Sequence, residues 1–330
     1  MLLIALLAPG TWLRSTVGDR ASADVTVTAL PFDNSAVAGF EVLGLWQLHG
    51  FAENFGGYSA MAPPGPEIVR LFSDKGWLLT IPRPDARRGP AGIRQLYPTG
   101  IPVIDLLDIE SVTYHPQTGQ YWVGYESRHT IYRYSVTGEP EAFVEPAYTT
   151  GWQSNGGIEA MARLADGRFL VLHEDGNDGY LYPGDPVEGA VPQQFTVAWP
   201  EDYSPTDMAQ LPDGRVLILL RKVAWHLPVF ESLIALADPA LIDSALIDSA
   251  SPWPVTVLAE LEQLVPRDNW EALSIEPPVE SVAGAIAGGA VNVWLASDDN
   301  RSAVQRSLLA KLRWTPPQPE QPEPGQTAEN

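Results

Sequence analysis

A two-strand pattern recurs along the chain, and it limits the possible folds more than any other feature. Each copy has a short apolar strand with one polar residue, in most copies a tight turn such as Ala165-Asp166-Gly167, and a second apolar run. The polar positions of the first strands are 51, 49, 48 and 64 residues apart, and they are Ser59, Glu110, Glu159, Asp207 and Glu271. A strand-based repeat of this length is typical of β-propeller blades.

The second strands also end at a polar or charged residue, so the repeat contains two polar columns. The second column follows the first by 15, 16, 15, 14 and 27 residues, and its members are Asp74, Glu126, Glu174, Arg221 and Asp298. A sandwich built from unrelated hairpins is the alternative fold, but nothing in it would keep two polar columns in register. We therefore predict an all-β protein with a propeller fold.

Five copies of the repeat are visible directly, and the remaining strands suffice for one more blade. These strands lie at residues 25–32, 40–50 and 308–314. We predict six blades, and five or seven also fit the pattern. If the first and last strands joined in one blade, they would close the ring and remove an exposed sheet edge. The 28 glycines, 31 prolines and 11 tryptophans suit a turn-rich β protein.

The charge of the chain excludes some functions. The formal net charge is −21, with 41 acidic residues against 20 basic ones. Such a surface repels a phosphate backbone, so we expect no nucleic-acid partner. There is no cysteine, so disulfides, thiolate metal sites and cysteine nucleophiles are excluded.

The two polar columns predict a metal site. The innermost strand of each blade faces the central channel, so equivalent acids would form a ring, and closely spaced carboxylates cannot all ionise without a cation or a basic partner. Hard oxygen ligands without cysteine favour Ca²⁺. The predicted metal ligands are Asp74, Asp108, Glu126, Glu174, Asp207, Glu271, Asp298 and Asp299. The alternative is that these polar residues bond to the backbone of the neighbouring blade and only hold the ring together.

The two ends of the chain differ in composition from the repeat region. Residues 1–23 contain the apolar run LLIALLAPGTWL and then Ala21-Ser22-Ala23, the small-x-small form of a signal-peptidase site. We expect a signal peptide or short anchor there, and a periplasmic or secreted protein. Residues 24–314 form the predicted propeller domain. Residues 315–330 are a Pro/Glu-rich tail that we expect to be disordered.

Several segments, taken together, resemble the phytase-like family described as "esterase-like activity of phytase". They are FGGYSAM with FSDKG, DIESV with YESRHTIYRY, NGGIEAMARLADGR, SPTDMAQLPDGRVLIL, and DNWEALS followed by SDDNRSAVQRSLL. They cover most of residues 54–312. The resemblance implies a β-propeller with a calcium-rich channel that hydrolyses phosphate or carboxylic esters. It also implies basic residues that hold the phosphate, for which the candidates are Arg128, Arg221, Lys222, Arg301 and Arg306. The scarcity of lysine favours a phosphoester smaller than phytate.

The function predicted from the sequence is an exported, Ca²⁺-dependent ester hydrolase, with a phosphoester favoured over a carboxylic ester. Glu159 or Glu110 would act as the general base, and Arg128, Arg221 and Arg301 would bind the substrate. Two alternatives stay open: a lactonase-type propeller, and a non-enzymatic propeller that binds a ligand or a partner. We expect a small-molecule ester as the substrate, no integral membrane domain, and a monomer, because a closed ring needs no partner to cover its edges.

Overall fold

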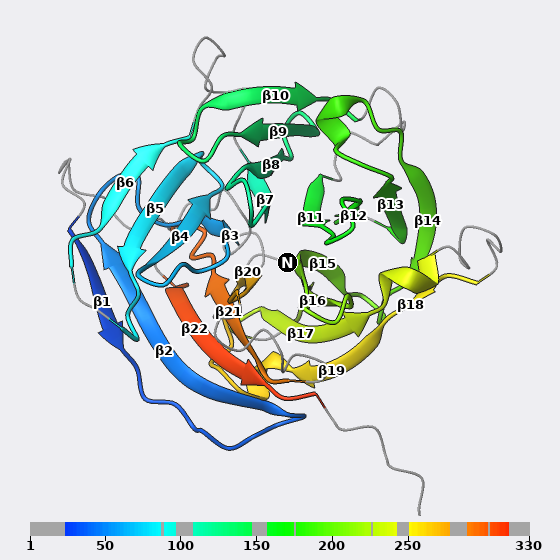
Figure 1. Ribbon diagram of the computed structural model, residues 1–330. Helices are drawn as coiled ribbons and strands as arrows, with labels where there is room; N and C mark the ends of the chain where they lie inside the picture. The colour runs from blue at the N-terminus through cyan, green and yellow to red at the C-terminus, as the bar shows by residue number, and fades with distance from the viewer. Residues whose placement is uncertain are drawn as a thin grey trace, which may run out of the picture.

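The computed structural model describes residues 24–86, 89–96, 108–146, 157–174, 176–225, 227–242, 251–277, 289–302 and 304–316. Five small sheets stand around a central axis and form a β-propeller (Figure 1). The fold prediction is therefore confirmed. The predicted signal segment at 1–23 and the tail from residue 317 onward lie outside the described residues. Among the described residues, no helix is both long and apolar enough to cross a membrane.

The first three blades follow one another in the chain, each running outward from the axis. Blade 1 contains β3 (Tyr58–Met61), β4 (Ile68–Ser73), β5 (Trp77–Pro82) and β6 (Gly92–Gln95). Blade 2 contains β7 (Ile109–Tyr114), β8 (Tyr121–Tyr125), β9 (Thr130–Tyr134) and β10 (Pro140–Val144). Blade 3 contains β11 (Ile158–Arg163), β12 (Phe169–His173), β13 (Asp178–Tyr182) and β14 (Gln193–Ala198), with the short β18 (Trp253–Pro254) at its outer edge.

The last two blades contain the rest of the strands. Blade 4 contains β15 (Ser204–Gln210), β16 (Val216–Val223), β17 (Phe230–Ala237) and β19 (Thr256–Glu260). Blade 5 contains β20 (Trp270–Ile275), β21 (Val291–Ser297), β22 (Ser307–Trp314), β2 (Phe40–Gly50) and β1 (Val25–Ala29). Three short 3-10 helices lie in the connections, and they are η2 (Pro186–Glu188), η3 (Pro239–Leu241) and η4 (Leu261–Gln263).

The ring has five blades, one fewer than the six that we preferred from the sequence. The strands that seemed to supply a sixth blade complete blade 5 instead. β2 pairs antiparallel with β22, from Phe40 opposite Trp314 to Leu48 opposite Ser307, and β1 then pairs with β2. Strands from both ends of the chain therefore share one sheet. This closes the ring and covers the edge of β22, as the sequence suggested.

Apolar side chains fill the space within and between the blades. The whole of β8 and the whole of β12 are buried, which explains why both read as continuous apolar runs. Trp122 of blade 2 packs edge-on against Phe169 of blade 3, with ring centroids 4.9 Å apart. Trp46 and Trp294 stack within blade 5 at 5.8 Å. These tryptophans are core residues.

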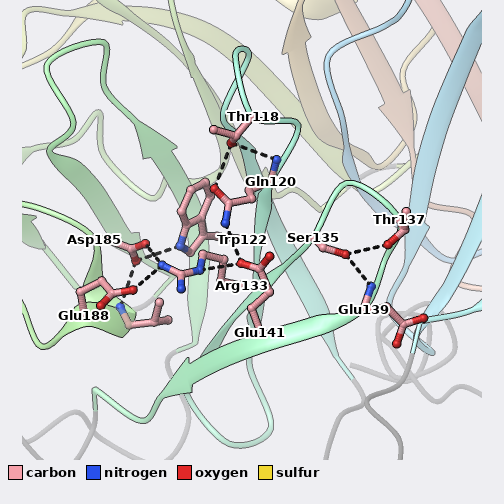
Figure 2. Close-up of polar contacts among 11 residues, drawn as sticks. Thr118, Gln120, Trp122, Arg133, Ser135, Thr137, Glu139, Glu141, Asp185 and Glu188 are labelled. Atoms are coloured by element: carbon pink, nitrogen blue, oxygen red, sulfur yellow. Dashed lines mark hydrogen bonds and ion pairs between the residues drawn. The ribbon is translucent and has the colours of Figure 1, made fainter.

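Polar contacts on the outer strands also connect neighbouring blades. Figure 2 shows Arg133 of β9 between acids from two blades: its guanidinium lies 2.7 Å from both Asp185 and Glu188 of blade 3 and 3.0 Å from Glu141 of β10. Trp122 Nε1 also donates to Asp185, at 2.9 Å. One arginine thus holds the outer edge of blade 2 to the η2 segment of blade 3, and the cavity described next depends on such fixed blade positions.

Candidate functional site

The innermost strand of every blade contains a β-bulge at the end where the strand begins. In each case one residue of the inner strand has no partner on the second strand, and these residues are Ser59, Glu110, Glu159, Thr206 and Glu271. A bulge locally bends the strand and re-aims the side chain at that position. Five equivalent bulges therefore surround the axis, and four of the five residues of the first polar column lie at them.

The second column lies beside the first, as predicted. Asp74, Glu126, Glu174, Arg221 and Asp298 each follow the residue of the second strand that pairs just before the bulge. The two columns meet in a cavity of about 340 Å³ at this end of the channel. Nine of the thirteen predicted site residues line it: Asp74, Asp108, Glu110, Glu126, Glu159, Glu174, Arg221, Glu271 and Asp298.

The carboxylates from blades 2 and 3 form two groups that could hold a cation. Oxygen atoms of Asp108, Glu110 and Glu126 all lie within 4.8 Å of one another, and so do those of Glu126, Glu159 and Glu174. Glu126 belongs to both groups. We call these five residues the carboxylate half of the cavity.

Local backbone features position the carboxylate half. Asp108 adopts a left-handed conformation with φ of 67°, its N–H donates to the Asp74 carbonyl at 2.6 Å, and its carbonyl accepts from Glu126 N–H at 2.7 Å. Gly157 lies directly under the Glu126 side chain, and a Cβ there would collide with it. A glycine at this position lets an acid from blade 2 reach the acids of blade 3.

Burial and like charge act together on the inner-strand acids. Burial raises the pKa of Glu110 well above its ordinary value, and the negative charges of Glu159, Glu271 and Asp108 raise it further. Burial also raises the pKa of Glu159 well above its ordinary value, with Glu174 as the next cause and Arg221 opposing it. Without a cation, these groups therefore hold protons at pH values where an exposed glutamate would be ionised.

On the opposite side of the cavity, an arginine neutralises the charge of an inner-strand acid. The Arg221 guanidinium forms an ion pair with Glu271, lies 3.6 Å from Glu174, and donates to Asn269 Oδ1 at 2.8 Å. Asn269 in turn donates to Glu271 at 2.8 Å. Burial opposes the charge on Arg221, but Glu271, Glu159 and Glu174 together keep its pKa above the usual value. We call Arg221, Asn269 and Glu271 the paired half of the cavity.

Two acids at the boundary of the halves behave differently from each other. Asp298 is buried, and burial together with the charges of Glu271 and Asp74 raises its pKa well above the ordinary value. Asp74 is partly exposed and forms an ion pair with Lys75 at 2.9 Å. Lys75, which also lines the cavity, was not among the site residues predicted from the sequence, although it directly follows a column residue in FSDKG.

One wall of the cavity is apolar, which the sequence did not indicate. Val223, Val229 and Phe230 line it from the β16–β17 hairpin. The Arg221 guanidinium lies 5.2 Å from the Phe230 ring centroid. Trp225, in the connection between these two strands, is 84% exposed. A bound molecule would therefore meet carboxylates on one side and apolar carbons on the other.

Asp207 does not lie where we predicted it. The bulge of blade 4 is at Thr206, so Asp207 is one residue beyond the first column. Its buried carboxylate accepts hydrogen bonds from Met208 N–H at 2.8 Å and from Leu273 N–H of blade 5 at 2.7 Å. Ser59 and Ser111 likewise donate to carbonyls of the next blade, those of Ile109 and Ile158. The blade-holding alternative thus describes Asp207, whereas the metal-ligand assignment does not fit its position.

Three other predicted residues also lie outside the lining of the cavity. Asp299 accepts from Gly57 N–H at 3.0 Å and from Ser307 Oγ at 2.7 Å, so it ties the β21–β22 loop to blade 1. Arg301 follows in the same loop with φ of 49°. Arg128 is at the rim, with half of its side chain exposed and its guanidinium 3.9 Å from Glu145.

Comparison with known proteins agrees with this architecture. The family model "Phytase-like: Esterase-like activity of phytase" matches residues 53–301, which is most of the chain. The chain belongs to the phytase-like family. The matched range spans all five inner strands and both polar columns. No curated protein matches the chain.

Two of the solved structures that match the chain share little sequence with it. Hsv2 from Kluyvelomyces marxianus has 8% sequence identity and a TM-score of 0.34, over 66% of this chain and 65% of that one. Dihydro-heme d1 dehydrogenase NirN in complex with DHE has 12% identity and a TM-score of 0.37, over 86% of this chain and 51% of that one. The chain thus spans about two thirds of Hsv2 and half of NirN.

Proposed function

We propose that the protein is a Ca²⁺-dependent hydrolase that cleaves a phosphoester or a related ester in the acidic cavity. The observation that carries this proposal is the carboxylate half, in which two groups of three carboxylates share Glu126. Membership of the phytase-like family supports a hydrolase of the propeller type.

The donor set of the carboxylate half fits calcium. Ca²⁺ takes six to eight oxygen ligands in flexible geometry, and each of the five residues offers up to two carboxylate oxygens. Glu110 and Glu159 gain a reason to ionise when a cation is present, because their pKa values are raised largely by burial and by neighbouring negative charge. Bound Ca²⁺ would neutralise the oxygens of the substrate and lower the pKa of a coordinated water.

Different residues would hold the cation, accept the proton and contact the substrate. Asp108, Glu126 and Glu174 would hold the cation, while Glu159 or Glu110, on the inner strands, would act as the general base. Arg221 is already engaged by Glu271, so its role is to keep that acid ionised and in place. Arg128 at the rim is half exposed and can reach an arriving anion.

The substrate range follows from the two walls. The cavity contains few cationic groups, so a highly charged substrate would have to rely on the metal. The apolar wall of Val223, Val229 and Phe230 favours a monoester with a hydrophobic group. The same wall supports a second candidate, a lactonase, because a lactone also presents a polar carboxyl group and an apolar ring.

A substrate panel tests the proposal. Wild-type protein, Glu159→Gln and the control Glu53→Gln, which alters an exposed loop acid, would be assayed on aryl phosphates, aryl acetates and lactones, with Ca²⁺ and after chelation. We expect calcium-dependent turnover that is lost in Glu159→Gln and retained in Glu53→Gln. Turnover of lactones alone would favour the second candidate. If Glu159→Gln keeps both calcium affinity and hydrolysis, the assignment is wrong.

We also propose that the protein is exported from the cytoplasm. Residues 1–23 have the composition of a signal peptide or a short anchor. The test is to express the full chain in a bacterium, fractionate the cells and sequence the N-terminus of the product. A periplasmic product that begins near Asp24 is expected, and a full-length cytoplasmic product would contradict it.

A further inference from the structure

A second cavity, of about 290 Å³, lies between blades 1 and 2 and has the opposite character to the acidic one. The inner strand β7 begins at the acidic cavity, which Glu110 lines, and ends at this second cavity, which Tyr114 lines. The two cavities are therefore at opposite ends of this strand. We call the second one the inter-blade cavity.

Two positively charged side chains line the inter-blade cavity. Arg70 of β4 and Arg94 of β6 line it, and none of the described residues that line it is an acid. Neither arginine forms an ion pair with another described residue, whereas arginines such as Arg83, Arg133 and Arg215 do. Both guanidiniums are exposed and have no ion-pair partner among the described residues, so an external anion that enters the cavity can bind to them.

A buried hydroxyl group lies beside these arginines. Tyr121 is 7% exposed, and no described residue meets its Oη with hydrogen-bond geometry, although the Arg94 guanidinium is close enough to oppose the rise in pKa that burial causes. Its ring is fixed by stacking on Tyr134 at 5.2 Å and by a tilted contact with Phe72 at 5.9 Å. A buried donor without a partner is costly, and most such groups in proteins are satisfied. A ligand oxygen in the cavity would satisfy it.

The position of Arg94 is set by the neighbouring blade. Gly138 has φ of 92°, and a Cβ at that residue would lie 2.6 Å from Arg94 Nη2. The guanidinium thus rests against the turn of blade 2 that includes the Ser135–Thr137 contact in Figure 2. Because Arg94 comes from β6 of blade 1, its side chain crosses the gap between the blades and lies against this turn of blade 2.

The remaining walls specify the rest of the ligand. Phe72, Leu78 and Val136 supply apolar surface, and Thr137 adds a hydroxyl group. We propose that the inter-blade cavity binds a small organic anion, a carboxylate or phosphate with an apolar body. Arg70 and Arg94 hold the charged group, Tyr121 Oη donates to it, and Phe72 and Leu78 cover the body. This site is separate from the acidic cavity and does not depend on the proposed hydrolase activity.

Calorimetric titration of the metal-free full chain tests the site. The probes are phenyl phosphate and benzoate, with inorganic phosphate lacking the apolar body and benzyl alcohol lacking the charge. We expect the two aromatic anions to bind and both control compounds to bind at least roughly tenfold more weakly, since about 1.4 kcal/mol separates each tenfold step. Chelator in the buffer keeps the probes from binding through a metal in the acidic cavity.

Variants assign any binding to this cavity. Arg70→Gln combined with Arg94→Gln should abolish it, and Tyr121→Phe should weaken it roughly tenfold through loss of one hydrogen bond. The matched control is Arg313→Gln, an exposed strand arginine of blade 5, which should bind like wild type. Unchanged unfolding temperatures of the ligand-free variants show that they are folded. Absence of binding by both aromatic anions, or equal binding by the double variant, overturns the proposal.

Discussion

The two halves of the acidic cavity are built from equivalent positions of the repeat but balance their charge in different ways. In the carboxylate half, Glu126 and Glu174 follow the second strands of blades 2 and 3 and face the inner-strand acids Glu110 and Glu159. In the paired half, the equivalent position of blade 4 is Arg221, and it forms an ion pair with the inner-strand acid Glu271. One change of residue type in the repeat thus places an arginine beside the inner-strand acid of the paired half, where the carboxylate half has a glutamate.

The comparison teaches that an acid in a repeated column has no fixed role. Glu159 and Glu271 occupy the same bulge position in different blades. Glu159 lies among carboxylates, whereas Glu271 accepts hydrogen bonds from Arg221 and Asn269. The neighbour across the channel decides whether the charge is available to a metal.

The largest effect should come from removing the positive charge of Arg221 in the paired half. Arg221→Gln leaves Glu271 buried without its counter-charge, and breaking a buried pair costs about 3 kcal/mol or more. We expect the metal-free protein to unfold roughly 6 to 12 °C lower, as measured by calorimetry. Arg221→Met combined with Glu271→Met removes both charges and should recover most of the loss. A loss below about 1 kcal/mol in the single variant would show that the pair is not important.

The next largest effect should come from the residue that both carboxylate groups share. Ca²⁺ at about 100 times its Kd should add about 2.7 kcal/mol to the wild-type protein, a rise of roughly 5 °C in unfolding temperature. Glu126→Gln should lose most of this rise, while Glu271→Gln should keep it. The measurement is thermal unfolding after chelation, with and without added Ca²⁺. An equal rise with Mg²⁺, or a full rise in Glu126→Gln, would contradict the calcium site.

A variant of Asp207 distinguishes a role in holding the blades together from a role in metal binding. Asp207→Ala removes the acceptor of Met208 N–H and of Leu273 N–H, which should cost about 2 kcal/mol. The rise on adding Ca²⁺ should stay the same as in wild type, because Asp207 does not line the cavity. Chemical denaturation at both calcium levels measures the two quantities. A smaller calcium effect in this variant would return Asp207 to the metal site.

The carboxylate half also predicts a pH dependence. The pKa values of Glu110 and Glu159 are raised in the folded protein, so the folded state binds more protons than the unfolded state above the ordinary value of 4.5. The stability of the metal-free protein should therefore fall as the pH rises from 4.5 through the raised pKa values. Glu110→Gln combined with Glu159→Gln should reduce this slope, as should saturating Ca²⁺. An identical slope in the double variant would show that other groups cause it.

The smallest effect on stability should come from the rim. Arg128 is half exposed and its contact with Glu145 is long, so Arg128→Gln should change the free energy of unfolding by less than about 0.5 kcal/mol. If Arg128 guides an anionic substrate, the same variant should raise KM and leave kcat nearly unchanged. Steady-state kinetics on the phosphoester that is turned over would measure this, and an unchanged KM would exclude the role.

Much of the architecture could be predicted because the repeat is local. The two polar columns lie 14 to 27 residues apart in each copy, with the turn and the apolar second strand between them, so they could be read from the sequence without knowing how the blades assemble. The whole second column, from Asp74 to Asp298, lies where the pattern placed it. The resemblance carried by segments such as NGGIEAMARLADGR agrees with the family match.

The register of the first column was harder to predict. A bulge adds one residue to a strand, and sequence spacing alone does not show which residue is left without a partner. In blade 4 the pattern favoured the acid Asp207, but the unpaired residue is Thr206. Thr206 and Asp207 are adjacent in β15, so a pattern that follows the acidic residues assigns the column position to Asp207.

The sequence by itself determined the strand repeat, the excess of acids and the residues that could meet at the axis. Only the tertiary structure decided that the ring closes with five blades, that Arg221 pairs with Glu271, and that Arg70, Arg94 and Tyr121 share the inter-blade cavity. The physical reason is distance along the chain. Turns and hairpin pairing depend on near neighbours, whereas Arg221 and Glu271 are 50 positions apart and the β2–β22 pair joins opposite ends of the chain. Such separations are fixed only when the blades pack around the axis.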